Sequence, residues 1–261
     1  MIDIHCHILP GVDDGAKDLE DSLEMARIAQ REGIKTIINT SHYHPDFDYV
    51  VGERLSEELV KFNTILKEHN IDVEVLMGNE LYYSDNLLEY IDKKEFHTLN
   101  NSKYILIEFA PTRFPKNLCD VVYELKIRGY IPILAHVERY QEVQESPKLI
   151  EEVIEEGALI QVNVSSVLGK GPSYYNRISD ILLNRNMVHF IGTDAHGSNR
   201  RRPLMKESYE YVSKKYGKDR ANRLFLDNPN SVKNNEDIVF IEEPVESSPK
   251  KSFLSKLFKR K

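Results

Sequence analysis

The chain opens with MIDIHCHILPGVDDG, residues 1–15, and this stretch decides the fold. It joins a short apolar strand to a His-x-His pair and an acidic turn at residues 13–15. Successive side chains on a strand point to opposite faces, so His5 and His7 should face the same side and Cys6 the other. We therefore expect a strand that carries two metal-type ligands to one end, with further carboxylates close behind.

A short strand followed by a longer amphipathic segment recurs along most of the chain. Strands buried on both faces are predicted at residues 2–5, 35–40, 73–77, 104–108, 131–135, 159–163 and 188–193. Helices are predicted at residues 18–32, 53–69, 117–128, 147–156 and 174–184, with more helix at 203–216 and 219–226. Successive strand–helix–strand units make parallel strands with right-handed crossovers, which predicts an α/β fold.

Such units close either as an open doubly wound sheet or as a barrel. Residues able to do chemistry follow nearly every predicted strand, whereas an open sheet concentrates them at one switch point. This favours a barrel of seven strands, a distorted TIM-like (βα)7 fold. We expect it to occupy residues 1–241 as one domain.

Histidines and carboxylates follow six of the predicted strands. They are His5, His7, His42, Glu80, Glu108, His136, Asp194 and His196, joined by a carboxylate from the turn at Asp13 and Asp14. The carboxyl ends of barrel strands meet at one rim, so these side chains should gather there. Imidazoles mixed with carboxylates suit Mn²⁺, Fe²⁺ or Zn²⁺, and the set is large enough for two or three ions. Such a cluster activates water and neutralises phosphate oxygens, which predicts a metal-dependent phosphoesterase.

Two choices among these ligands stay open. We favour Asp14 over Asp13, although an Asp-Asp-Gly run also fits an ordinary turn. Only one of His42 and His44 need bind a metal. The remaining histidines, His69, His97 and His189, are expected to be turn or core residues.

Arginines near the predicted rim are candidates for phosphate binding, because a guanidinium binds phosphate oxygens bidentately. Arg139 lies three residues beyond His136, and the run 200–202 follows Asp194. Aromatic residues are expected to wall the pocket; the candidates are Tyr43, Phe47, Tyr82, Phe114 and Tyr140.

Composition excludes several other classes of protein. A formal charge of -7 argues against a broadly basic nucleic-acid binder. Two cysteines are too few for a disulfide framework, and we expect Cys6 to be buried and reduced. The chain lacks a basic region followed by an apolar stretch at its start, so we expect a cytoplasmic protein.

The last residues differ in character from the rest. Residues 242–249 are expected to be a solvated linker, and residues 250–261 a basic tail with a narrow apolar stripe. A solubilising tail and a short helix that contacts a membrane or partner weakly are both open interpretations.

The ligand pattern resembles the polymerase and histidinol phosphatase (PHP) superfamily. Within it, residues 5–15 and the run His136-Val137-Glu138-Arg139-Tyr140 are similar to the bacterial manganese-dependent tyrosine-protein phosphatases of capsule and exopolysaccharide clusters. The resemblance covers about residues 1–230.

This resemblance implies a (βα)7 barrel and a three-metal site, with Mn²⁺ as the expected metal. One ion would take His5, His7, Glu80 and Asp194; a second Glu80, Glu108 and His136; and a third Asp14, His42 and His196. Arg139 and an arginine before Pro203 would hold the phosphate; Arg201 and Arg202 both fit the spacing, and Arg202 is our choice. The substrate would be phosphotyrosine on a bacterial tyrosine kinase that controls polysaccharide synthesis. His136 should be essential for turnover.

Two other functions compete with this interpretation. The nearer one is a small-molecule phosphatase such as histidinol-phosphate phosphatase. The other is a non-catalytic adaptor that docks a kinase or membrane through the basic tail, and the complete ligand set argues against it.

Overall fold

A computed structural model describes residues 1–238 of the chain except residues 45 and 113. Its strands are β1 Ile2–Cys6, β2 Thr36–Asn39, β3 His42–Tyr43, β4 Glu74–Leu76, β5 Glu80–Tyr82, β6 Tyr104–Glu108, β7 Ile131–Leu134, β8 Leu159–Asn163 and β9 Phe190–Gly192. All of the strand pairs run parallel. The α/β fold with parallel strands predicted from the sequence is therefore confirmed.

The strands form two sheets. The smaller has the order β1-β2-β4 and the larger the order β3-β5-β6-β7-β8-β9. Thr40 and Ser41 separate β2 from β3, and residues 77–79 separate β4 from β5. At the other side of β1, an isolated parallel bridge joins Cys6 to Ala195, just beyond β9.

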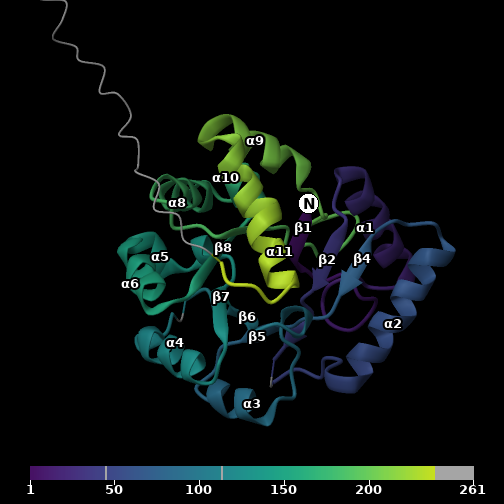
Figure 1. Cartoon of the computed structure of the whole chain (residues 1–261), viewed down its shortest axis with the longest axis horizontal. Helices are drawn as coiled ribbons and strands as arrows, with labels where there is room; N and C mark the ends of the chain where they lie inside the picture. Colours follow the sequence, from purple (N-terminus) through teal and green to yellow (C-terminus); the bar gives the residue numbers. More distant parts are fainter. Residues whose placement is uncertain (45, 113, 239–261) are drawn as a thin grey trace, which may run out of the picture.

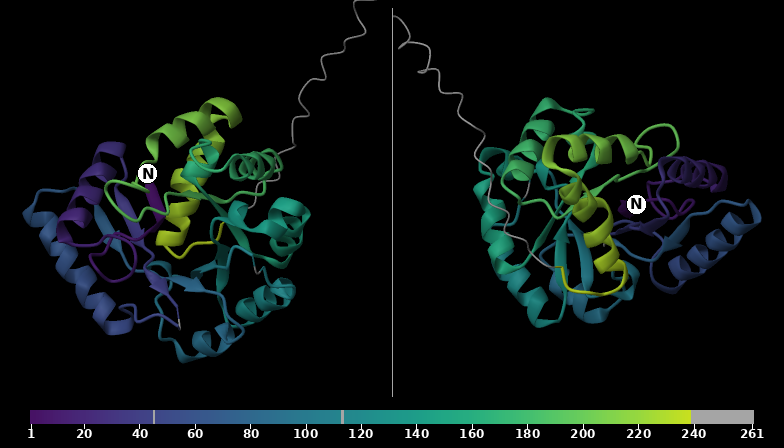
Figure 2. Two further views of the ribbon diagram at one scale, coloured as in Figure 1. Left: turned by 180° about the vertical axis from the view of Figure 1, so that it is seen from behind. Right: turned by 45° about the horizontal axis from the view of Figure 1, so that its top comes forward.

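Helices surround the strands, as Figures 1 and 2 show. They are α1 Leu19–Glu32, α2 Gly52–Glu68, α3 Leu87–Lys93, α4 Leu118–Ile127, α5 Gln141–Glu145, α6 Lys148–Glu156, α7 Val164–Val167, α8 Ser173–Asn184, α9 Lys206–Tyr216, α10 Lys218–Asn222 and α11 Asn228–Lys233. Short 3-10 turns lie at Leu99–Asn101 and Val137–Arg139, and a π-helical turn at Arg223–Asp227 precedes α11. None of the helices within the described residues is long and apolar enough to cross a membrane.

Helix α1 illustrates how local sequence fixes an element. The Asp18 side chain accepts a hydrogen bond from the Asp21 N–H and caps the helix start. Gly33 ends the helix in the left-handed region at φ 81°, where its N–H bonds to the carbonyls of Ala29 and Gln30. Between these caps, Leu23 and Ala26 lie on the buried face. The helix thereby carries the chain from the acidic turn back toward the start of β2.

Apolar side chains form two clusters. The larger lies where strands meet the surrounding helices, with Phe62, Leu125 and Leu182 among its members. The smaller combines residues from β1, β2, β6, β7, β8 and β9: Ile4, Ile38, Leu106, Ile133, Leu159 and Phe190, with Val232 of α11. Its members come from strands far apart in the sequence, so the strands share one inner core.

The predicted elements match the observed ones with a few additions. Each predicted strand and helix is present, within a few residues at its ends. The strands predicted to end at residues 40 and 77 continue after an interruption as β3 and β5. The helices α3, α5, α7 and α11 are additions that the sequence analysis does not predict. The predicted linker and tail, residues 242–261, lie outside the described residues.

Candidate metal centre

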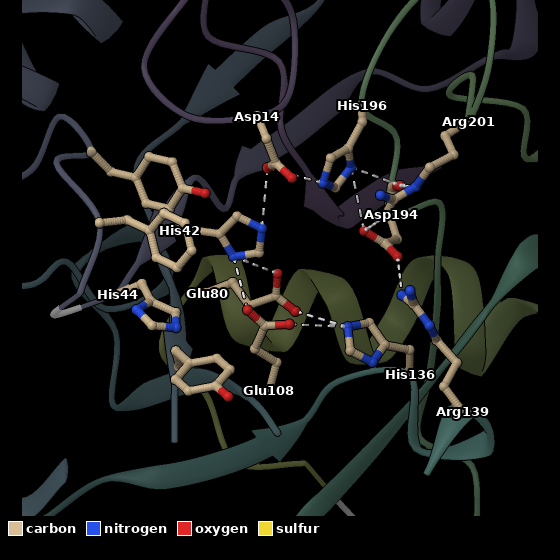
Figure 3. Close-up of a pocket in the computed structure, with 13 residues that line it drawn as sticks. Asp14, His42, His44, Glu80, Glu108, His136, Arg139, Asp194, His196 and Arg201 are labelled. Carbon is tan, nitrogen blue, oxygen red and sulfur yellow. Dashed lines mark hydrogen bonds and ion pairs between the residues drawn. The ribbon is translucent and has the colours of Figure 1, made fainter. Parts of the chain in front are cut away.

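All nine predicted metal ligands gather at the carboxyl ends of the strands. They are His5 in β1, His7 just after it, Asp14 in the following turn, His42 in β3, Glu80 in β5, Glu108 at the end of β6, His136 after β7, and Asp194 and His196 after β9. Figure 3 shows seven of them around one pocket. Two of these residues, His136 at φ 36° and Asp194 at φ 51°, have left-handed backbones, a costly conformation that is typical of functional sites.

Glu80 lies at the centre of the cluster and is 1% exposed. Its Oε1 is 3.2 Å from Nε2 of His5 and 3.1 Å from Nε2 of His136. Its Oε2 is 3.3 Å from both Nε2 of His7 and Nδ1 of His42. A carboxylate with four imidazoles this close is placed to bridge cations.

Hydrogen bonds behind the cluster fix how four of its imidazoles are oriented. Nδ1 of His7 lies 2.7 Å from a carboxylate oxygen of Asp13, and Nδ1 of His196 lies 3.1 Å from the carbonyl of Asp194. Nδ1 of His5 lies 3.2 Å from Oε1 of Gln161, and Nδ1 of His136 is 3.3 Å from the hydroxyl of Tyr140. Carboxylate, carbonyl and amide oxygens can only accept, and the Tyr140 hydroxyl donates its own proton to the carbonyl of Ala135. All four oxygens therefore favour the Nδ1–H tautomer, which leaves the lone pair of Nε2 for a metal.

His42 differs, because both of its ring nitrogens lie within 3.3 Å of carboxylates that are themselves predicted metal ligands. Nε2 is 3.3 Å from Asp14 Oδ1, while Nδ1 is 2.9 Å from Glu108 Oε1. The Nδ1 atom is buried without a hydrogen bond of good geometry in the described residues. A ring nitrogen and a carboxylate oxygen this close, without a good hydrogen bond between them, fit two ligands of one metal ion.

The side chains fit divalent metals by the chemistry of their donors. Their ligand atoms fall into four overlapping groups within 4.8 Å: His7, Asp14, His42 and His196; His5, His7 and Glu80; His5, His136 and Asp194; and His42, Glu80 and Glu108. Mixed nitrogen and oxygen sets of this kind suit Mn, Fe or Zn. The overlap through Glu80 and the histidines indicates more than one ion.

Charge strongly perturbs this cluster. Burial disfavours the charged form of Glu80, but the charge of His5 and hydrogen bonds from His136, His5 and His7 outweigh it and hold the Glu80 pKa well below its usual range. Burial also lowers the His5 pKa, yet the charges of Glu80 and Asp194 raise it to about 9. For His196, burial and the neighbouring charge of His7 lower the pKa to about 3. The buried carboxylates of the cluster therefore favour positive charge between them.

Two arginines border the cluster. Arg139 donates from NH1 to Oδ2 of Asp194 at 2.9 Å, and Arg201 pairs with Oδ1 of the same carboxylate. Both line the pocket in Figure 3. Arg202 is not among the described residues lining this pocket, whereas Arg201 is, so the structure favours Arg201 over our choice of Arg202 as the second phosphate candidate. A left-handed residue at Arg201, φ 43°, turns the loop at this point, which strand and helix spacing could not reveal.

The pocket above the cluster holds about 390 Å³ and has an aromatic wall. The rings of Phe47 and Tyr49 stack 5.2 Å apart, and His44 lies 3.9 Å from the ring of Tyr82. His44 therefore belongs to this wall, whereas His42 lies among the predicted metal ligands. Figure 3 shows the wall opposite the two arginines.

The predicted wall is only partly the observed one. Phe47 and Tyr82 line this pocket, whereas Tyr43 and Tyr140 are buried in the core and Phe114 lines a neighbouring cavity. Tyr49 was missed, since an aromatic residue in a loop carries no periodic signal. The other expectations match: Cys6 and His189 are buried, and His97 bonds to the carbonyl of Gly52.

The parallel α/β fold and this ligand set define a metal-dependent hydrolase. Residues 1–234 match the family described as "Capsular polysaccharide synthesis, CpsB/CapC", and the chain belongs to it. The family predicted from the sequence is therefore confirmed.

Curated relatives in this family carry one activity in their names. Tyrosine-protein phosphatase CpsB of Streptococcus pneumoniae is 34% identical over 237 residues, which are 89% of this chain and 98% of the relative. Tyrosine-protein phosphatase YwqE of Bacillus subtilis is 37% identical over 219 residues, 84% of this chain and 86% of the relative.

Solved structures agree with these relationships. A structure from a study of YwqE and CpsB, described as unique metal-dependent tyrosine phosphatases, has a TM-score of 0.87 at 36% identity and covers 92% of this chain and 96% of its own. Histidinol phosphate phosphatase from Lactococcus lactis has a TM-score of 0.56 at 16% identity, covering 86% of this chain and 95% of its own. The second likeness is one of fold alone.

Proposed function

We propose that the chain hydrolyses phosphotyrosine in a protein substrate at the centre built around Glu80. It is a metal-dependent protein-tyrosine phosphatase, in keeping with its family and with relatives matched over most of its length. The observation that carries the proposal is the Glu80 carboxylate, within 3.3 Å of four imidazoles and beneath a pocket edged by two arginines.

The ligand assignment that we propose is the one implied by the resemblance, and the four groups of neighbouring donor atoms contain all nine of its residues. We assign His5, His7, Glu80 and Asp194 to one ion, Glu80, Glu108 and His136 to another, and Asp14, His42 and His196 to a third. Mn²⁺ is the metal we propose, and Fe²⁺ or Zn²⁺ suits the same donors. Bound ions would supply an activated water and positive charge toward the phosphoryl oxygens.

The protein's own residues bind and orient the substrate. Arg139 and Arg201 bind different oxygens of Asp194 and both line the pocket, where we propose that their guanidiniums hold the phosphoryl oxygens. The aromatic side chains of Phe47, Tyr49 and Tyr82 are placed to contact the tyrosine ring. A phenolate, of pKa about 10, leaves more readily than an alkoxide, so the reaction needs less help from a general acid.

We also infer that the strands close into the distorted seven-membered barrel expected from the sequence. The continuity of β2 with β3 and of β4 with β5 joins the two sheets on one side, and the bridge between Cys6 and Ala195 joins β1 to the β9 segment on the other. The small apolar cluster shared by six strands supports an enclosed centre.

The physiological context is proposed from the family. A capsule or exopolysaccharide tyrosine kinase is the substrate we propose, met in the cytoplasm where such a kinase has ATP. Residues 1–241 would form the catalytic domain, and the tail at 242–261 would make at most weak contacts with a membrane or partner. A nucleic-acid substrate is not part of the proposal, given the charge of -7.

The test compares substrates, metal and one ligand variant. Hydrolysis of a phosphotyrosine peptide and of histidinol phosphate would be measured with and without Mn²⁺, on wild type, His136→Ala and the exposed control His69→Ala. We expect Mn²⁺-dependent turnover of the peptide by wild type and H69A and none by H136A. Preference for histidinol phosphate would favour the small-molecule alternative, and full activity of H136A at saturating Mn²⁺ would remove His136 from the centre.

A further inference from the structure

Strand β8 supplies no ligand to the metal centre, yet it carries two buried amides that face it. The strand reads Leu-Ile-Gln-Val-Asn over Leu159–Asn163, and Gln161 and Asn163 lie on the same face. Their exposed fractions are 0% and 5%. Buried amides cost free energy unless they are hydrogen-bonded, so the partners of these two groups show what they do.

Gln161 is bonded to two predicted ligands through one atom. Its Oε1 accepts from the backbone N–H of His136 at 2.8 Å and lies 3.2 Å from Nδ1 of His5. The N–H of His136 can only donate, so the oxygen of Gln161 must face it. Nδ1 of His5 must then donate to the same oxygen, which turns the Nε2 lone pair of His5 toward Glu80.

Asn163 extends the network to a third ligand. The Nε2 of Gln161 donates to Oδ1 of Asn163 at 2.8 Å, and Nδ2 of Asn163 donates to Oδ2 of Asp194 at 2.9 Å. Arg139 also donates to this Oδ2, while the other oxygen of Asp194, Oδ1, pairs with Arg201 and lies 3.4 Å from Nε2 of His5. The buried carboxylate of Glu138 fixes Asn163 in turn, accepting its backbone N–H at 3.0 Å.

We infer that Gln161 and Asn163 are positioning residues that orient His5, His136 and Asp194 for metal binding. The inference deepens the proposed function and rests on it. The hydrogen bonds of this network run in one direction, since Gln161 donates to Asn163 and Asn163 donates to Asp194. Strand β8, which supplies no metal ligand, thus orients His5 on β1, His136 after β7 and Asp194 after β9.

Substitutions at Gln161 separate positioning from packing. Methionine keeps the volume of the side chain but removes the acceptor, and asparagine keeps the amide but is too short to reach. Glutamate keeps the acceptor toward His5 and, when protonated on its other oxygen, the donor toward Asn163. If Gln161 only fills space, Mn²⁺ binding should instead be retained in Q161M and weakened in Q161E, because methionine suits a buried site and a buried carboxylate does not.

The control is an amide with equally complete bonding far from the pocket. Asn63 on α2 donates from Nδ2 to the carbonyl of Val75 at 2.8 Å and accepts the N–H of Val75 at 3.1 Å. Asn63→Leu removes these bonds without touching the described lining of the metal pocket.

The experiment titrates Mn²⁺ into the metal-free full chain and follows free Mn²⁺ by its electron paramagnetic resonance signal. Thermal melts of the metal-free proteins check folding. We expect Q161M and Q161N to weaken Mn²⁺ binding by about 10- to 100-fold and Q161E and N63L to bind nearly as wild type does. Q161N keeps the test decisive should Q161M not fold.

The results distinguish a failure of the positioning role of Gln161 from a failure of the proposed metal centre. Wild-type affinity in Q161N or Q161M, or a loss in Q161E equal to that in Q161M, would overturn the positioning role alone. A wild-type protein that bound no Mn²⁺, Fe²⁺ or Zn²⁺ would overturn the metal centre itself, and the positioning role with it.

Discussion

The carboxylate of Asp13 lies 2.7 Å from Nδ1 of His7, on the side of the imidazole that faces away from the metal pocket. The same carboxylate also accepts the N–H groups of Gly15 and His42, both at 2.9 Å. Asp14, its neighbour in the chain, instead faces Nε2 of His42 at 3.3 Å and Nε2 of His196 at 3.6 Å. Two consecutive aspartates therefore have different surroundings, and we expect Asp13 to orient His7 and Asp14 to bind a metal.

This division predicts different responses to metal. Asp13→Ala should weaken Mn²⁺ binding by about 10- to 100-fold through the loss of a ligand's orienting partner, so excess Mn²⁺ should recover much of the activity. Asp14→Ala removes a donor, and its loss of turnover should persist at saturating Mn²⁺. Turnover against Mn²⁺ concentration measures both, with the exposed Asp48→Ala as control. Equal recovery of the two variants would contradict the division.

The choice between the arginines before Pro203 gives a second prediction. Arg201→Ala should lower kcat/KM for a phosphotyrosine peptide by roughly 100-fold, because Arg201 borders the pocket and meets Asp194. Arg202→Ala, next to it but outside the described lining of this pocket, should stay close to wild type. Steady-state kinetics on the two variants decide between them, and a larger effect at Arg202 would restore the choice made from the sequence.

Gly15 gives a third prediction, on backbone packing. A Cβ added there would lie 2.5 Å from both Cβ and the carbonyl oxygen of His7, closer than real atoms approach. Gly15→Ala should therefore displace His7 or the turn and lower both metal affinity and thermal stability. Gly171→Ala is a matched control, since its nearest neighbour, Tyr175, would be 3.8 Å away. Isothermal titration with Mn²⁺ and thermal melts check this, and an unaffected G15A would show that the turn yields easily.

The sequence points more readily to the metal-type residues of the cluster than to the residues that hold them in place. His5, His136 and Asp194 are metal-type residues at strand ends, and parallel strands bring their ends together whatever the loops do. Gln161 was missed because an amide within an apolar strand suggests no chemistry by itself. Its position two residues before Asn163, on the same face, was the available signal.

The interruptions that divide one predicted strand into two, as between β4 and β5, are the part of the fold that is hardest to predict. The predicted strand at 73–77 extends through Gly78 and Asn79 into β5, which is three residues long. Gly78 fits there because an added Cβ would lie 2.8 Å from a methyl group of Leu99 and 3.0 Å from the carbonyl of Asn39. Such a close approach is a tertiary contact, and hydrophobic periodicity does not report it.

Metal removal should destabilise the protein. The cluster holds four carboxylates among five imidazoles, so an ion that binds only the folded state stabilises it by mass action. At a free Mn²⁺ concentration of 100 times Kd, one site adds about 2.7 kcal/mol to the free energy of unfolding. Thermal melts with Mn²⁺ and with EDTA should differ for wild type and differ less for H136A. An identical shift in both would place the stabilising ion elsewhere.

His189 should make the protein sensitive to acid independently of the metal centre. It lies at the start of the β9 segment, where its Nδ1 accepts the N–H of Ile160 at 3.0 Å, and burial lowers its pKa to about 3. In the unfolded chain it titrates near 6.5, so between pH 6.5 and 3 the unfolded state binds a proton that the folded state does not. Stability from this group is therefore complete above pH 6.5 and is lost as the pH falls below it.

His189→Asn keeps an acceptor for Ile160 but cannot titrate. From pH 7.5 to 5.5 in EDTA, wild type should lose about 1 kcal/mol more unfolding free energy than H189N, as measured by urea denaturation. Equal losses would mean that His189 is protonated in the folded state, with its hydrogen bond to Ile160 broken.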